Sequence, residues 1–306
     1  MPFRTEHYNI EQVAEGIYAA IARPEGYALS NSGMVDLGDA PLIFDTSMCP
    51  RAADDLGRAT ARILGAPPSL AANSHWHLDH SLGNHQFQGI PIFGTRRTRE
   101  ILLERHDELM AELARDEIMK SLHEFEEKRE AARSEAARAD LDFLVQLHRA
   151  LLADAGNLSV TPPDHTFENK LSLPGSRDAV LLSFGAGHTE ADALLFLPRE
   201  RVLFAGDLVV ATNQPSLGSG DPGHWLAVLD QIEHLGAERV VPGHGPVIPT
   251  EGIRETRDYI SGILEAAQTA PGSPLPPAIR RWEGSLTLDQ NLRFARGLAP
   301  PSAERK

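Results

Sequence analysis

Short apolar runs separated by turn residues fill most of the N-terminal part of the chain. Runs with the length and composition of strands lie at residues 16–21, 29–37, 41–46 and 69–73. Gly38-Asp39, between two of these runs, is typical of a hairpin. The stretch 51–64 predicts a helix, because Gly65 and Pro67-Pro68 follow it as stop signals.

The pattern changes between residues 95 and 155, where the chain has no glycine or proline. Apolar residues recur there at helical spacing, while the stretch 124–140 is almost wholly polar and carries both charge signs. We expect two or three long helices that form an arm, a name kept below for residues 95–155. The pattern leaves three roles open for the arm: a spacer, a contact that pairs chains, or a lid over an active site.

Strand-like runs return after Gly156, and two helical stretches accompany them. The runs lie at 166–167, 171–173, 179–184, 193–197, 201–205 and 239–242, and the helices at 225–235 and 250–267. Strands, helices, strands and helices in this order predict an α/β fold with two sheets face to face and helices outside, a four-layer αββα sandwich. We expect one domain over 1–270, with a helical insertion at about 95–155, and a segment 271–306 that contains a linker, a C-terminal helix and a polar tail.

Composition narrows the class of protein. The 306 residues are 42% hydrophobic but contain no long apolar run, which predicts neither a signal peptide nor a membrane span. A single cysteine, Cys49, fits a reducing compartment, so we expect a cytoplasmic protein. The net charge of -14 argues against binding to nucleic acid but not against a small anionic substrate at a metal ion.

The candidate chemistry begins directly after the strand at 69–73. The segment His75-Trp76-His77-Leu78-Asp79-His80 places three imidazoles and one carboxylate within six residues, and these groups are typical metal ligands. Three further positions follow strand-like runs beside glycine: His188, Asp207 and His244. A lone histidine after a strand is more often structural, but loops at strand ends meet at one edge of a sheet, so we expect these groups to lie together.

Taken in order, the motifs His-x-His-x-Asp-His, Gly-His-Thr, Gly-Asp and Pro-Gly-His-Gly resemble those of the metallo-β-lactamase superfamily. The resemblance covers nearly the whole chain except the arm and the last thirty residues, and the αββα fold of that family agrees with the layers predicted above. It implies a centre of two metal ions, usually zinc, with iron or manganese as alternatives. The implied ligands are His75, His77 and His188 at one ion, Asp79, His80 and His244 at the other, and Asp207 between both.

The resemblance also implies a mechanism. A hydroxide that bridges the two ions attacks a carbonyl carbon, one ion stabilises the oxyanion, and Asp79 orients the hydroxide and carries a proton. Asp45 matches the buried aspartate with which members of the family brace the histidine loop through hydrogen bonds.

Single positions distinguish branches of the family. Its secreted β-lactamases carry cysteine or serine at the position of Asp207, and its diiron flavoproteins carry glutamate at the position of His77. The branch with a bridging aspartate contains glyoxalase-II-like thioesterases and lactonases, so we expect a hydrolase of an ester, thioester or lactone carbonyl, with β-lactamase activity as a side reaction. The alternative is an oxidoreductase with one iron ion that resembles persulfide dioxygenases, and a binding protein without catalysis is a third, weaker reading.

The remaining candidates have less support. Cys49 precedes a predicted helix, where a thiolate would be favoured, but a complete ligand set lies elsewhere and we do not expect a nucleophile there. Asp192 suits either a partner of the metal site or a cap of a turn. Trp76 is expected in packing, and surface or loop positions are expected for His85, His165 and His224. We expect a small-molecule substrate, neither nucleic acid nor membrane as a partner, and, if the arm pairs chains, a homodimer.

Overall fold

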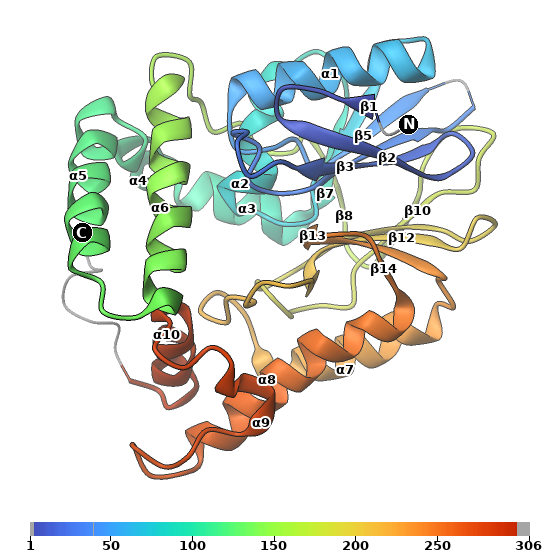
Figure 1. Ribbon diagram of the computed structural model, residues 1–306. Helices are drawn as coiled ribbons and strands as arrows, with labels where there is room; N and C mark the ends of the chain where they lie inside the picture. Colours follow the sequence, from blue (N-terminus) through green and yellow to red (C-terminus); the bar gives the residue numbers. More distant parts are fainter. Residues whose placement is uncertain (1–2, 39, 299–306) are drawn as a thin grey trace.

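A computed structural model describes residues 3–38 and 40–298 of the chain (Figure 1). Its first sheet has eight strands that lie in chain order. They are β1 (Phe3–Arg4), β2 (Tyr8–Ala14), β3 (Ile17–Ala22), β4 (Ser32–Asp36), β5 (Pro41–Phe44), β6 (Leu70–Ala72), β7 (Ile92–Thr95) and β8 (His165–Phe167). Strands β1 to β5 pair antiparallel and β5 to β8 pair parallel, so the carboxyl ends of the last four strands share one edge.

The second sheet has six strands in the order β14-β13-β12-β11-β10-β9. Their bounds are β9 (Lys170–Ser172), β10 (Val180–Leu182), β11 (Leu194–Leu197), β12 (Val202–Val210), β13 (Arg239–His244) and β14 (Ile248–Pro249). Only β12 and β13 pair parallel among these strands. Their shared direction brings the C-terminal parts of both strands to the same end of the sandwich.

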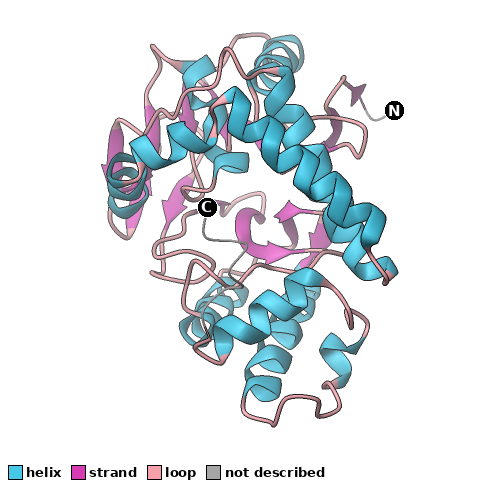
Figure 2. Cartoon of the chain, turned by 90° about the vertical axis from the view of Figure 1, so that its left-hand side faces the viewer, coloured by secondary structure: helices cyan, strands magenta, loops and turns pink. Residues whose placement is uncertain are grey.

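Helices cover the outer faces of both sheets, as Figures 1 and 2 show. The helices are α1 (Pro50–Leu64), α2 (Leu78–Ser81), α3 (Arg96–Glu104), α4 (His106–Glu112), α5 (Arg115–Ala131), α6 (Glu135–Ala153), α7 (Pro222–His234), α8 (Ile253–Ala267), α9 (Pro277–Arg280) and α10 (Leu286–Ala295), with 3₁₀ turns η1 (Leu82–Phe87) and η2 (Thr250–Gly252). Helix α1 packs on the first sheet and α7 and α8 on the second. The predicted four-layer αββα sandwich is therefore confirmed.

An apolar layer between the two sheets holds them together. Phe44 of β5 and Phe204 of β12 meet in this layer with ring centroids 6.1 Å apart, and Leu42 and Leu195 are fully buried beside them. Burial of each such side chain contributes about 1.5–3 kcal/mol to folding. The alternating strand pattern of the sequence sets which side chains enter this layer.

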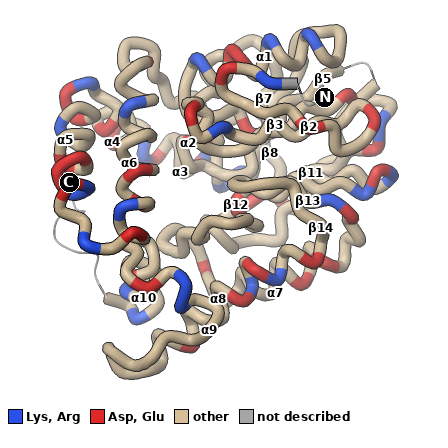
Figure 3. The backbone as a smooth tube through the Cα atoms, in the orientation of Figure 1, with Lys and Arg blue, Asp and Glu red and all other residues tan. Residues whose placement is uncertain are grey.

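The arm contains the predicted long helices, α5 and α6, preceded by the short helices α3 and α4. Helices α5 and α6 form a hairpin with both charge signs along it (Figure 3), and Arg129–Asp142 and Glu126–Arg149 are ion pairs between the two helices. Ile118 is the one residue of α5 classed as buried. Helix α6 has five buried residues, so it carries most of the buried face of the hairpin while α5 is largely solvated.

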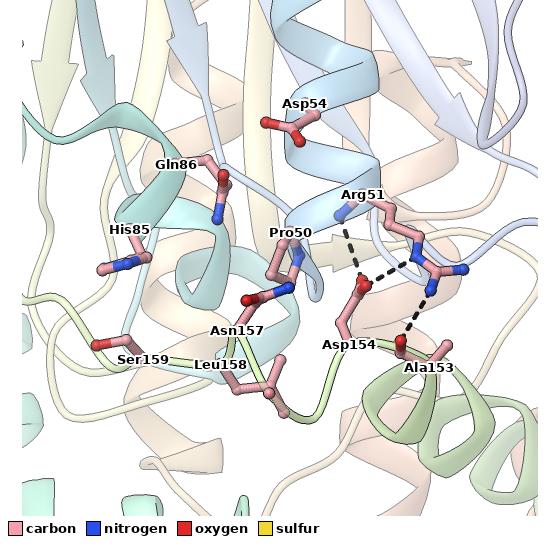
Figure 4. A pocket seen from close by; sticks show the side chains of 11 residues that line it. Pro50, Arg51, Asp54, His85, Gln86, Ala153, Asp154, Asn157, Leu158 and Ser159 are labelled. Carbon is pink, nitrogen blue, oxygen red and sulfur yellow. Dashed lines mark hydrogen bonds and ion pairs between the residues drawn. The ribbon is translucent and has the colours of Figure 1, made fainter.

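A surface pocket of about 610 Å³ lies where the end of the arm meets α1 and η1 (Figure 4). Arg51 of α1 and Asp154, next to the end of α6, form an ion pair there with 2.8 Å between Nε and Oδ1. Arg51 also donates to the Ala153 carbonyl at 2.8 Å. The pocket is lined by residues other than the seven predicted metal ligands, and its contacts tie the arm to the first layer of helices.

Two strands differ from the prediction. Strand β12 continues to Val210 and β13 to His244, so Asp207 and His244 lie within strands and not in the loops after them. The register of β12 with β13 shifts on both sides of Gly206, because this glycine has a φ of 51°. Asp39 of the predicted hairpin and the tail residues 302–306 lie outside the described residues. The division of the chain near residue 270 stays a prediction.

In the described ranges, 3–38 and 40–298, no helix combines the length and the apolarity needed to cross a membrane.

Candidate metal centre

The histidine loop follows β6 and is held from beneath by Asp45. The Ser74 N–H and Oγ–H donate to the two Asp45 carboxylate oxygens at 2.7 and 2.8 Å, and His80 Nδ1 donates to Asp45 Oδ2 at 2.9 Å. Asp45 is fully buried and has a φ of 62°, a backbone conformation in which few residues other than glycine are found. The hydrogen bonds predicted for Asp45 are therefore present, and they fix both ends of the loop.

Asp207 and His244 come from the parallel strands β12 and β13. A Cβ atom at Gly243 would lie 1.9 Å from Asp207 Oδ1, so glycine is required at this position for the carboxylate to reach the site. Asn31, from the other sheet, donates from Nδ2 to the Pro242 and Gly245 carbonyls at 2.9 and 2.8 Å. The two sheets thus hold the His244 turn between them.

His188 lies in a turn between β10 and β11 that Asp192 closes. The N–H and Oγ–H of Thr189 donate to Asp192 at 3.1 and 2.7 Å. Burial raises the pKa of Asp192 to about 7, although these hydrogen bonds favour its ionised form. Of the two roles left open for Asp192, these contacts support the cap of the turn.

The structure brings all seven predicted ligands together. They form two groups, and within each group the ligand atoms lie within 4.8 Å of one another. The groups are His75, His77, His188 and Asp207, and Asp79, His80 and His244. Asp207 faces both, because its Oδ1 lies 3.2 Å from His80 Nε2 while its Oδ2 lies 3.4 Å from His188 Nε2. This division is the one that the family resemblance implies.

Each of the five histidines has one ring nitrogen held from outside the cluster. His75 Nδ1 donates to Ser74 Oγ, whose own hydrogen is donated to Asp45, and His77 Nε2 contacts Ser219 Oγ. The remaining three contacts are His80 Nδ1 to Asp45, His188 Nδ1 to the Ser216 carbonyl and His244 Nδ1 to the Leu29 carbonyl, at 2.9 to 3.1 Å. Such outer contacts fix the tautomer and aim the other nitrogen inward, as metal-binding histidines require.

The inward atoms fit a metal ion better than they fit one another. Within the described chain, His75 Nε2, His80 Nε2 and Asp207 Oδ1 are buried polar atoms without a hydrogen-bond partner. The 3.2 Å contact of His80 with Asp207 brings opposite charges close but lacks hydrogen-bond geometry. Buried polar atoms left unpaired are costly, and three of them in one cluster of imidazoles and a carboxylate match the donor set of zinc.

The electrostatics divide the cluster into a neutral and a charged part. Burial and neighbouring imidazoles hold the pKa of His75 well below its ordinary value and lower that of His77 to about 3. Burial acts in the same direction on His244, but the Asp207 and Asp79 carboxylates outweigh it and raise its pKa to about 10. Burial likewise opposes ionisation of Asp79, yet the His80 and His244 imidazoles hold its pKa well below the ordinary range.

The arm reaches the cluster through Phe143 of α6. Its ring lies edge-on to the His244 ring, with 6.4 Å between the centroids, and the residue is still 40% exposed. On another side, Trp76 packs among arm residues, as its expected packing role requires, and Arg105 lies 4.8 Å above its ring. The arm therefore borders the cluster of predicted ligands on the side where Asp79 and His244 are partly exposed.

Other candidates lie apart from the chemistry. Cys49 is buried, its Sγ contacts the Tyr27 carbonyl at 3.3 Å, and burial raises its pKa to about 12. The expectation that a thiolate is favoured there is wrong, because desolvation outweighs the effect of the helix start. His165 and His224 are exposed and His85 is partly exposed, and each has a hydrogen-bonding neighbour outside the cluster.

Sequence reasoning missed the residues that hold the ligands from outside. Ser216 and Leu29 act through main-chain carbonyls, which any residue type supplies, so no sequence signal marks them. Asn31 and Ser219 act through side chains but lie far along the chain from the motifs they support.

Comparisons with known proteins agree with this arrangement. The sequence model of the metallo-beta-lactamase superfamily matches residues 26–244. The "Metallo-beta-lactamase type 2" of Bacteroides fragilis is 30% identical over 112 residues, which are 34% of this chain and 44% of that protein. The "Beta-lactamase-like protein 2 homolog" of Caenorhabditis elegans is 40% identical over 74 residues, 24% of each chain. The chain thus spans less than half the length of these curated relatives.

Solved structures share the fold over a larger part of the chain. A metallo-beta-lactamase from Pontibacter korlensis aligns with a TM-score of 0.59 at 18% identity, covering 83% of this chain and 99% of that one. The metallo-beta-lactamase FIM-1 from Pseudomonas aeruginosa, in a mono-zinc form, aligns with a TM-score of 0.58 at 17% identity, covering 83% and 95%. These likenesses establish the fold, and the sequence model covers more than half of the chain. The chain belongs to the metallo-beta-lactamase superfamily.

Proposed function

We propose that the chain is a hydrolase with two metal ions that cleaves an ester, thioester or lactone. The observation that carries the proposal is the pair of ligand groups that share Asp207. Divalent ions supply a water of lowered pKa as a nucleophile and polarise a carbonyl group. The three unpaired inward atoms, His75 Nε2, His80 Nε2 and Asp207 Oδ1, support occupancy of both groups.

Asp79 is the residue best placed to handle a proton. Its side chain is 18% exposed, more than that of His80 or Asp207, and its Oδ2 lies 3.2 Å from His244 Nε2. The lowered pKa of Asp79 keeps the carboxylate ionised at neutral pH, where it accepts hydrogen bonds and orients a water. His80 is fully buried and holds its place through Asp45, so it serves as a fixed ligand.

A β-lactam is the second candidate substrate. It is favoured by the names of the Bacteroides fragilis relative and of the solved structures, which are metallo-beta-lactamases. A β-lactam is a cyclic amide and needs the same attack on a carbonyl carbon. Asp207 stands where the secreted enzymes of the family carry cysteine or serine, which favours esters and thioesters for this chain.

We assign the arm to the substrate side of the site. The exposed Phe143 ring beside His244 offers an apolar surface to a substrate whose carbonyl is at the metal cluster. A substrate with an apolar acyl or ring substituent would bury that surface. Pairing of chains through the arm is the competing role, and measurement of the mass in solution separates the two.

The proposal is tested by metal content and by a substrate panel. We expect about two zinc ions per chain and turnover of lactones or thioesters that is lost in His75→Ala and in Asp207→Ala, with the circular dichroism of the fold retained. One iron per chain together with oxygen consumption would instead support the oxidoreductase with a single iron ion. Full activity of a preparation stripped of metal by a chelator would overturn both.

A further inference from the structure

The loop between β12 and α7, residues 211–221, holds two of the three histidines in the group that contains Asp207. His188 Nδ1 donates to the Ser216 carbonyl at 3.0 Å, and His77 Nε2 contacts Ser219 Oγ at 3.1 Å. Because the Ser216 carbonyl is the acceptor that His188 Nδ1 has among the described residues, its position sets the direction of His188 Nε2. The question is therefore what holds Ser216.

Asn291 of α10 forms hydrogen bonds with the residues on both sides of Ser216. Its Oδ1 accepts from the Leu217 N–H at 2.9 Å, and its Nδ2 donates to the Pro215 carbonyl at 2.8 Å. A main-chain N–H only donates and a carbonyl only accepts, so these two contacts fix the orientation of the carboxamide. Asn291 is 2% exposed, and both peptide groups beside Ser216 are thus held by one buried side chain.

The same carboxamide takes part in a series of hydrogen bonds that leads to the arm. Asn291 Nδ2 also donates to the Tyr259 hydroxyl at 3.0 Å, and this hydroxyl donates to Gln214 Oε1 at 3.1 Å. Gln214 Nε2 donates to Ser285 Oγ, and Ser285 Oγ donates to Asp140 Oδ2, both at 2.7 Å. Each hydrogen bond of this series joins a donor to an acceptor, and together they link Asn291 to Asp140 of the arm.

We propose that Asn291 is a positioning residue for the metal centre: it fixes the Ser216 carbonyl and, through that carbonyl, the His188 imidazole. The inference rests on the proposed metal centre, but Asn291 itself lies outside 26–244, the range that the family model matches. It gives the C-terminal helix α10 a role in the site. It also explains why an amide is buried at this point, because an apolar side chain would leave the Leu217 N–H and the Pro215 carbonyl without these hydrogen bonds.

The test compares Asn291→Ala with Leu292→Ala on the same helix. Leu292 is buried in the apolar core beside α10, so its truncation destabilises the helix without removing a hydrogen bond from the 215–217 peptides. Zinc binding is titrated with a competing chelator, the spectrum of the Co²⁺-loaded protein reports ligand geometry, and thermal melting reports stability. Tyr259→Phe serves as a second control, because it removes one partner of Asn291 and leaves both peptide contacts.

We expect Asn291→Ala to weaken one of the two zinc-binding steps about tenfold, the lower end of what loss of an outer contact costs a metal site, and to change the Co²⁺ spectrum. Leu292→Ala should lower the melting temperature at least as much as Asn291→Ala does. Both Leu292→Ala and Tyr259→Phe should leave the two zinc-binding steps within about twofold of wild type. Asn291→Asp keeps the acceptor for Leu217 and loses the donor to Pro215, and it replaces Asn291→Ala if that variant does not fold.

Two outcomes overturn the inference. One is zinc binding by Asn291→Ala that equals wild type, and the other is an equal loss in Leu292→Ala. If the wild-type chain itself binds no metal, the proposed function fails as well. If wild type binds two ions and Asn291→Ala does too with unchanged affinity, the inference alone fails.

Discussion

Metal binding to this chain should release protons from one half of the site and not from the other. His244 and His80 sit among carboxylates that hold their pKa values above the ordinary range, at about 10 for His244, against the opposing effect of burial. An imidazolium cannot bind a metal ion through the protonated nitrogen, so each must lose a proton first. His75 and His77 have lowered pKa values and are already neutral at pH 7.

The size of the effect follows from the pKa of His244. At pH 7 the group is about three pH units below its pKa of about 10. At 1.36 kcal/mol for each unit, its deprotonation costs about 4 kcal/mol, which is about a thousandfold in apparent affinity for the ion that needs it. The affinity of that binding step should therefore rise about tenfold for each unit of pH for each proton released. The other step should change little between pH 6.5 and 8.

Calorimetric titration of the metal-free protein with zinc measures this directly. Repeating it in buffers of different ionisation enthalpy gives the number of protons released in each binding step. We expect one binding step to release no proton from the protein and the other step to release between one and two protons. A water at the ion also loses a proton on binding, and His244→Ala separates the two sources because it removes only the imidazole proton. Equal proton release by wild type and His244→Ala would refute the reasoning.

Three further substitutions test the residues that surround and position the predicted ligands. Gly243→Ala places a methyl group 1.9 Å from Asp207 Oδ1, so we expect loss of zinc from both groups and about 1–3 kcal/mol lower stability, read by metal analysis and denaturant unfolding. Asp45→Asn removes the carboxylate partner of His80 Nδ1 and should weaken zinc binding about 10–100-fold in a chelator competition, whereas unchanged affinity would exclude a bracing role. Phe143→Ala should raise KM for substrates with apolar acyl groups about 5–30-fold, which corresponds to about 1–2 kcal/mol of lost contact, and leave zinc binding and acetyl-sized substrates unaffected.

The sequence predicts which side chains come together in the cluster, because imidazole and carboxylate groups are recognised by residue type. Imidazole and carboxylate groups at strand ends identify His75, His188 and Asp207, and the two sheets that bring them together follow from apolar runs and turn residues. The exact ends of β12 and β13 were harder to predict. Leu208-Val209-Val210 continues the buried strand past Asp207, and the register with β13 shifts at Gly206, which has a positive φ.

The contacts that hold the ligands are less visible in the sequence for a physical reason. His188 and His244 donate to main-chain carbonyls, which are present at every residue and carry no sequence signal. Asn31 and Asn291 reach their partners across more than 200 and about 75 residues, so no local pattern relates them. Cys49 shows the opposite case, where a local signal for a reactive thiolate was outweighed by burial that only the fold reveals.

The arm contacts both a predicted ligand and the hydrogen-bond network that holds the ligands. Its helix α6 carries Asp140, which accepts the last hydrogen bond of the network from Asn291, and one turn later Phe143, which lies beside His244. These two contacts support the proposed substrate-side role of the arm, and the mass in solution tests the competing pairing of chains. The position of Phe143 is thus fixed by the same C-terminal segment that holds the His188 loop. If the arm has the proposed substrate-side role, a substitution that displaces α6 should alter substrate preference and, through Asn291, metal binding at the same time.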